Sequence, residues 1–189
     1  MFIFKKKYFF IIESIKDINL KNIKNFGKYS IIYRNNSPEN IDKLKKFRLK
    51  CKIKRIPFFV ANNINLIKAL KADGLYISAY NKKFISNYLR RSFKIIGSAH
   101  NIKEINLKKL QGCTEIILSR LFKTSYKNKK DFLGVIKFNL LSKLMNTTLT
   151  PLGGINLKNL NNLKNINCEN VALSSLVKNE SNKIHTSLR

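Results

Sequence analysis

Eight short apolar runs, spaced about 20 residues apart, constrain the fold of this 189-residue chain more than any other feature. Each run is nearly continuous in aliphatic, β-branched or aromatic residues, as expected for strands that are buried on both faces of a parallel sheet. The runs are YFFII (8–12), YSIIYR (29–34), PFFVA (57–61), GLYIS (74–78), KIIGSA (94–99), EIILSR (115–120), TTLTPL (147–152) and NVALSS (170–175).

The segments between these runs carry the spacing of amphipathic helices. Segment 41–54 has apolar residues near one side, namely Ile41, Leu44, Phe47 and Leu49. Segment 132–145 has them at helical intervals, namely Phe132, Leu133, Ile136, Leu140 and Leu144. Residues typical of helix starts stand before such segments: Ser37 with Pro38, Asn101 with Glu104, Asp131, and Asn156.

Strands that alternate with helices in this number predict an α/β fold of the (β/α)8 type, a compact TIM barrel. Such barrels typically need about 250 residues, so short loops and a truncated last helix are expected here. An open doubly wound sheet is the alternative architecture. No linker rich in Gly, Ser or Pro divides the chain, so we expect one domain over residues 1–189.

The chain is strongly basic, with 38 Lys and Arg against 10 Asp and Glu, a formal net charge of +28. A field of this sign attracts phosphorylated metabolites, nucleic acids or acidic membrane surfaces. The abundance of Lys, Asn and Ile offers a second explanation, because A/T-rich codons supply these residues without selection for a ligand.

Cysteine usage and hydropathy indicate a cytoplasmic protein. Cys51, Cys113 and Cys168 are far apart and odd in number, which argues against a disulfide framework or a zinc site. The apolar run 8–12 is too short for the core of a signal peptide, and no stretch approaches the length of a membrane span. We therefore expect no membrane partner.

Two small-residue pairs follow the last two strands. In a parallel barrel, active sites form at the carboxyl ends of the strands, and the loops after strands 7 and 8 often bind phosphate. Gly153-Gly154 and Ser174-Ser175 occupy these loops. Glycines admit a ligand close to the backbone, and amide groups at the start of the next helix favour an anion. The alternative explanation for the glycines is a tight turn.

His100 also follows a strand, where its imidazole could act as a general acid or base near neutral pH. The alternative is a histidine that is hydrogen-bonded to a neighbouring loop and has no chemical role.

Five stretches, in order and at barrel spacing, resemble the thiamine phosphate synthase and thiazole tautomerase superfamily. ADGLYIS (72–78) is similar to its ADGVHLG, and KIIGSAH (94–100) to its IIGxSxH. SRLFKTSYK (119–127) resembles GPVFPTxTK, PLGGIN (151–156) resembles AIGGIN, and NVALSSLV (170–177) resembles GVAVVSAI. The likeness covers nearly the whole chain.

The resemblance implies a transferase that joins hydroxymethylpyrimidine diphosphate to thiazole phosphate and releases pyrophosphate. The pyrimidine–oxygen bond ionises first, and the thiazole nitrogen then traps the cation. By motif position, the diphosphate would be held by Arg34, Ser98, Thr124 and Lys127, of which Arg34 and Lys127 would be catalytic. The thiazole phosphate would be held by Gly153, Gly154, Ser174 and Ser175. Asn36 and Asn62 fall at further substrate-binding positions.

The chain departs from the family pattern at the metal site. The resemblance implies Mg²⁺ bound after strands 3 and 4, where the family has aspartates and this chain has Asn62 and Asn81. Magnesium favours charged oxygens, and an amide supplies only a neutral one. One hypothesis is that lysines of the loop after strand 6, namely Lys123, Lys127, Lys129 and Lys130, replace the charge of the metal.

Three functions are open at this point. The first is a thiamine phosphate synthase, favoured by Arg34, Thr124 and Lys127. The second is a thiazole tautomerase or a relative that binds phosphorylated ligands without coupling them, favoured by the missing aspartates. The third is a nucleic-acid-binding module, based on charge and on aromatic residues of the basic loop. No nucleic-acid-binding motif is present, so we do not favour the third.

Overall fold

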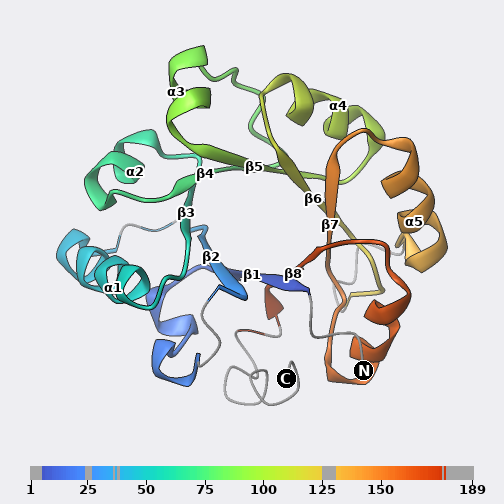
Figure 1. Ribbon diagram of the computed structural model, residues 1–189, viewed down its shortest axis with the longest axis horizontal. Coiled ribbons are helices and arrows are strands. Elements are labelled where there is room, and N and C mark those ends of the chain that lie inside the picture. Colours follow the sequence, from blue (N-terminus) through green and yellow to red (C-terminus); the bar gives the residue numbers. More distant parts are fainter. Residues whose placement is uncertain are drawn as a thin grey trace.

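Eight parallel strands form a closed barrel in which each strand pairs with the next along the chain and β8 pairs with β1 (Figure 1). The computed structural model describes residues 6–23, 27–35, 37, 39–124, 131–175 and 177. The strands are β1 (Lys7–Ile12), β2 (Tyr29–Tyr33), β3 (Phe58–Ala61), β4 (Gly74–Ile77), β5 (Lys94–Ala99), β6 (Glu115–Ser119), β7 (Thr148–Leu152) and β8 (Asn170–Leu173). The predicted barrel is confirmed, and the open sheet is excluded.

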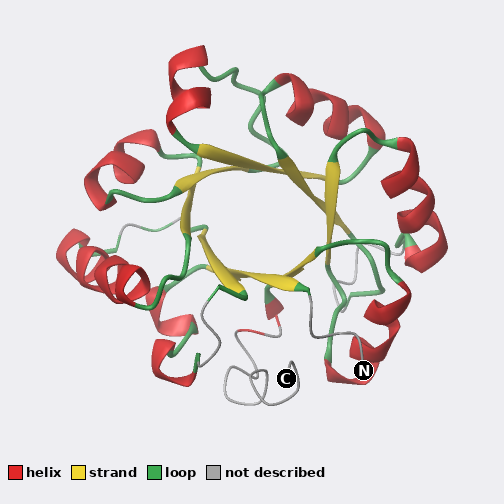
Figure 2. Ribbon diagram, in the orientation of Figure 1, coloured by secondary structure: helices red, strands yellow, loops and turns green. Residues whose placement is uncertain are grey.

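Helices surround the barrel on its outer side (Figure 2). They are α1 (Ile41–Ile53), α2 (Ile64–Leu70), α3 (Asn87–Ser92), α4 (Ile102–Leu110) and α5 (Gly134–Leu144). After β1 and β7 the outer layer is made of 3₁₀ helices, namely η2 (Ile15–Asp17), η3 (Leu20–Asn22) and η4 (Leu157–Asn165). Each of the first seven strands is therefore followed by helical structure, which is of the 3₁₀ type after β1 and β7.

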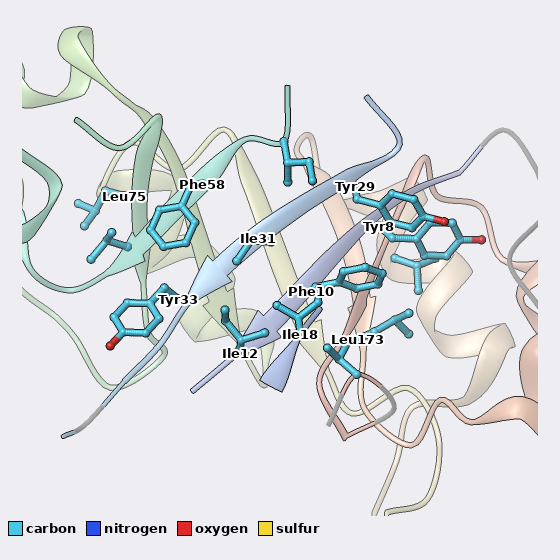
Figure 3. Close-up of a cluster of buried hydrophobic side chains, with 14 of the residues drawn as sticks. Tyr8, Phe10, Ile12, Ile18, Tyr29, Ile31, Tyr33, Phe58, Leu75 and Leu173 are labelled. Carbon is cyan, nitrogen blue, oxygen red and sulfur yellow. The ribbon is translucent and has the colours of Figure 1, made fainter. Parts of the chain in front are cut away.

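Apolar side chains fill two separate cores because strand residues alternate between the two faces of the barrel wall. The inner core is a compact group within the barrel: Phe9, Ile11, Ile32, Phe59, Tyr76, Ile96, Ile117 and Ala172. The outer core lies between strands and helices, and Figure 3 shows its aromatic part, with Tyr8 and Phe10 of β1 beside Tyr29 of β2. Tyr29 and Phe10 stack with ring centroids 5.0 Å apart.

A polar cluster lies at the amino ends of four neighbouring strands, from β5 to β8. The buried Glu115 carboxylate accepts hydrogen bonds from Thr150 Oγ1 and from Asn170 Nδ2, at 2.5 and 2.6 Å. Lys94 Nζ lies 3.5 Å from the other carboxylate oxygen. The cluster therefore joins strands at the end of the barrel that is opposite the expected site.

Two of the four expected helix starts are confirmed. Asn101 accepts a hydrogen bond from Glu104 N at 2.9 Å, and Asn156 caps η4. Helix α1 begins at Ile41 after Asn40, which accepts from the amides of residues 42 and 43, so Ser37 was the wrong cap. Helix α5 begins at Gly134 without a side-chain cap, so Asp131 was also wrong.

Only part of the apolar set expected for residues 132–145 packs on the barrel: Leu133 contacts the core, whereas three others of the set face away. Ile136, Leu140 and Leu144 are 85%, 56% and 66% exposed, whereas Phe138 is fully buried. In α1, likewise, Leu44 and Phe47 are buried and Leu49 is 58% exposed.

Candidate active site

A cavity of about 420 Å³ lies over the carboxyl ends of the strands, on the side formed by β5 to β8, β1 and β2. It is lined by Ile11, Arg34, His100, Ser119, Arg120, Lys123, Thr124, Leu152, Gly153, Gly154, Ile155, Asn156, Ser174 and Ser175. The two small-residue pairs after β7 and β8 therefore face the same space, as the barrel fold requires.

The glycine pair is needed for packing as well as for access to the cavity. Both residues have positive φ, +98° at Gly153 and +70° at Gly154. A Cβ atom on Gly154 would lie 2.5 Å from the carbonyl oxygens of Phe122 and Lys123. The loop after β6 runs along this segment, with Leu121 N donating to Leu152 O and Phe122 N to Gly153 O. The tight-turn explanation and the ligand explanation are thus both compatible with the geometry.

The start of η4 differs from the expected row of bare amide groups. The Asn156 side chain accepts hydrogen bonds from the amides of Lys158 and Asn159, at 3.0 and 3.2 Å. Asn159 Nδ2 in turn donates to Gly154 O at 2.8 Å. The amides of Asn156, Lys158 and Asn159 at this helix start therefore have side-chain partners, and a phosphate here would depend on the glycine backbone and on Ser174 and Ser175.

Arg34 enters the cavity from the end of β2. Its guanidinium lies 3.5 Å from Glu13 Oε1, in a pair of which both side chains are more than one third exposed. Arg34 also donates to the phenol of Tyr76, which shares a second hydrogen bond with Ser98. Burial raises the pKa of Tyr76, and these two hydrogen bonds and the Arg34 charge oppose the rise.

Ser98 therefore contacts Tyr76 beneath the cavity and is not among the residues that line it. Tyr76 was not among the predicted site residues. Its position where the family has histidine was the only available signal.

The segment after β6 contributes two cations and a hydroxyl group. Arg120 and Lys123 line the cavity, and Arg120 Nη1 donates to Thr124 Oγ1 at 3.2 Å. Arg120 was not among the predicted site residues, since nothing in its local sequence distinguishes it among 38 cations. Lys127 and Asn36, which were expected near the diphosphate, lie outside the described residues.

His100 lines the cavity and is held by the first turn of α4. Glu104 Oε2 accepts from His100 N at 2.8 Å and lies 3.0 Å from His100 Nδ1. Burial by itself would raise the pKa of Glu104, but hydrogen bonds from His100 and Asn101 outweigh it and hold this pKa below its ordinary value. The partner of His100 thus lies in α4 and not in a neighbouring loop, and the acid–base role stays a prediction.

Asn62 and Asn81 form an amide network on the β3–β4 side and do not line the cavity. Asn62 Oδ1 accepts hydrogen bonds from Ser78 N and Asn81 Nδ2, at 3.1 and 3.0 Å. Asn81 Oδ1 accepts from Lys83 N at 3.0 Å. The buried Lys108 donates to Asn81 O at 2.7 Å and holds the loop in place.

The family model for thiamine monophosphate synthase matches residues 16–177, which is most of the chain. The chain belongs to this family. A thiamine-phosphate synthase of Prochlorococcus marinus subsp. pastoris is 36% identical over 128 residues, which are 66% of this chain and 36% of the relative. One from Persephonella marina is 29% identical over 134 residues, which are 70% of this chain and 64% of the relative. The chain thus spans about one third to two thirds of the length of these relatives.

Solved structures of two differently named proteins share the fold of this chain. The thiamine phosphate pyrophosphorylase from Pyrococcus furiosus superposes with a TM-score of 0.77 at 16% identity, over 100% of this chain and 95% of that one. The phosphoribosyl anthranilate isomerase from Thermotoga maritima gives 0.66 at 11% identity, over 97% and 95%. At these identities the likeness concerns the fold alone.

The residues at the family's metal position do not fit a magnesium ion. Mg²⁺ binds through charged carboxylate oxygens, whereas Asn62 and Asn81 offer neutral amide oxygens that already accept hydrogen bonds from this chain. Within the described ranges, no group of three or more His, Cys, Asp or Glu side chains is placed to hold a metal ion. In the same ranges, no helix is long and apolar enough to cross a bilayer.

Proposed function

We propose that this protein is a thiamine phosphate synthase that couples hydroxymethylpyrimidine diphosphate with thiazole phosphate and releases pyrophosphate. The observation that carries the proposal is the convergence of Arg34, Thr124, the glycine pair and the serine pair on one cavity. A cytoplasmic location agrees with three free cysteines and remains a prediction.

The two substrates take opposite ends of the cavity in this proposal. Ser174, Ser175 and the backbone at Gly153-Gly154 bind the thiazole phosphate. Arg34 and Thr124 bind the diphosphate, together with Lys127. Ser98 acts through Tyr76 to orient Arg34, because it contacts Tyr76 and does not line the cavity.

Catalysis follows from charge stabilisation and the exclusion of water. When the pyrimidine–oxygen bond breaks, both bonding electrons leave with pyrophosphate, so negative charge grows on the leaving group. Cations fixed around that group stabilise the transition state more than the ground state. The thiazole nitrogen then attacks the carbocation with its lone pair. Neither step transfers a proton, so the reaction does not require His100 as an acid or a base.

A relative that binds phosphorylated ligands without coupling them, or a thiazole tautomerase, is the second candidate. The observation that favours it is the amide network at Asn62 and Asn81, where the family has magnesium-binding aspartates. Nucleic-acid binding has no comparable support.

Calorimetric titration with each phosphorylated substrate, followed by a coupling assay with and without Mg²⁺, distinguishes the candidates. We expect both substrates to bind and thiamine phosphate to form. Binding of thiazole phosphate without any product, under both metal conditions, would refute the synthase and leave the second candidate.

A further inference from the structure

Three cations from two separate segments surround the cavity. Arg34 follows β2, and Arg120 and Lys123 follow β6. Of the described residues that line the cavity, none carries a carboxylate. The carboxylate near this group is Glu13, which lies 3.5 Å from Arg34 in a pair that is exposed to solvent and therefore weakly neutralising. The described wall of the cavity is thus positively charged and favours the binding of an anion.

Arg120 and Lys123 also depart from the family pattern. In GPVFPTxTK, which aligns with SRLFKTSYK (119–127), both of these positions are proline. The chain therefore gains two positive charges at the cavity wall. At Asn62 and Asn81 it lacks the two negative charges that would hold a divalent cation. The two added positive charges equal the charge of one magnesium ion.

Thr124 orients Arg120. Arg120 Nη1 donates to Thr124 Oγ1 at 3.2 Å, which holds the guanidinium at the wall of the cavity. A guanidinium is a planar fork whose donors match two oxygens of a phosphate group, and an ammonium group such as that of Lys123 adds a compact charge.

We infer that Arg120 and Lys123 bind the diphosphate directly, together with Arg34, and that this binding needs no divalent cation. The inference rests on the proposed function, because it assigns the diphosphate of that reaction to this cavity. It gives Arg120 a binding role. Of the four lysines that were expected to replace the charge of the metal, Lys123 is the one among the described residues. Fixed cations here take the place of the metal in holding the leaving group.

Calorimetric titration of the whole protein with inorganic pyrophosphate, in EDTA and in Mg²⁺, tests the metal requirement. We expect the dissociation constant in EDTA to lie within about threefold of the value in Mg²⁺. Affinity that falls by about tenfold or more in EDTA would overturn the inference. This measurement needs no variant, so it does not depend on whether any substituted protein folds.

The double variant Arg120→Gln/Lys123→Gln tests the residues. We expect pyrophosphate affinity in EDTA to fall by about tenfold or more, since two charge-assisted contacts are lost. The matched control is Lys46→Gln/Lys50→Gln, which removes the same charge from the exposed side of α1. An equal loss in the control would overturn the inference, because it would trace the effect to net charge.

The swapped variant Arg120→Lys/Lys123→Arg keeps both charges and separates charge from packing. We expect it to bind pyrophosphate more tightly than the glutamine variant, because both charges remain, with circular dichroism and thermal melting to check folding. A folded swapped protein as weak as the glutamine variant would overturn the inference. Failure of the proposed function looks different: pyrophosphate would bind without metal, yet no thiamine phosphate would form from the two substrates.

Discussion

Gly154 allows the backbones of two loops to pack closely against each other. Its φ of +70° belongs to the left-handed region, which side chains with a Cβ rarely adopt. The carbonyl groups of Phe122 and Lys123 lie against it, and Lys123 is one of the cavity cations. The glycine therefore sets the distance between the loop after β7 and the segment that carries Arg120 and Lys123.

Gly154→Ala tests this packing, with Gly134→Ala as the matched control. Both glycines have φ of +70°, but a Cβ on Gly134 would meet nothing within 4 Å. We expect Gly134→Ala to cost about 1–2 kcal/mol from backbone strain alone. Gly154→Ala adds a clash and should cost about 3–5 kcal/mol, measured by urea unfolding. Equal losses in the two variants would contradict the close packing.

Because of Glu104, we expect the free energy of unfolding to depend on pH in the acid range. Its pKa lies below the ordinary value in the folded protein, so its hydrogen bonds stabilise the fold above the ordinary carboxyl pKa. That contribution is lost as the pH falls through the lowered value. We expect Glu104→Gln to be less stable than the original protein near pH 7, and the difference to shrink between about pH 5 and pH 2. Urea unfolding across this range is the measurement, and a constant difference would argue against the assignment.

At the scale of the element, α5 has apolar residues on both of its faces. Phe138 is fully buried against the barrel, and Leu133, Val135, Leu141 and Met145 pack on the same core. Ile136, Leu140 and Leu144 form a second stripe that faces away. Both stripes have helical spacing, so periodicity alone could not show which of them would contact the strands.

Phe138→Ala and Ile136→Ala measure the difference between the two faces. Deleting the buried ring leaves a cavity, so we expect Phe138→Ala to cost about 3–5 kcal/mol. Ile136 is 85% exposed, and its replacement should change stability by no more than about 0.5 kcal/mol. Urea unfolding compares the two variants directly. A larger loss at Ile136 would mean that its face is covered in solution.

At the scale of the whole molecule, closure of the barrel depends on contacts between its last strands and its first. β8 pairs with β1 over residues 7–10, while between β7 and β8 the registered pair is Leu152 with Ala172. The Glu115 cluster joins β6 to β7 and β8 at their amino ends. These buried polar contacts keep together the strands whose loops form the glycine and serine side of the cavity.

Glu115→Leu tests the contribution of this cluster. The change leaves Thr150 and Asn170 without their buried acceptor, and we expect a loss of about 2–4 kcal/mol in urea unfolding. Adding Thr150→Val and Asn170→Leu removes the polar groups that lost their hydrogen-bond partner. The triple variant should therefore recover about 1 kcal/mol or more of the free energy of unfolding. If the triple variant were less stable than the single one, the loss at Glu115 would come from volume and not from unpaired polar groups.

Much of the fold and part of the site could be predicted from the sequence. Continuous apolar runs are a local signal of strands buried on both faces, so the eight strands and the barrel followed from it. The convergence of Arg34, His100, Thr124, Gly154 and the serine pair also followed, because carboxyl ends of parallel strands meet at one rim. The caps at Ser37 and Asp131 were wrong because other side chains and loop contacts compete for the same helix starts.

The sequence by itself determined the strand order, the rim that holds the site and the family, since these depend on local patterns and on chain order. Only the tertiary structure decided which face of α5 packs inward, which of the described cations reach the cavity, and that Tyr76 joins Arg34 to Ser98. It also decided that the oxygens of Asn62 and Asn81 are committed to the protein. The physical reason is that most of these contacts join residues that are distant in the chain, and local spacing carries no information about such contacts.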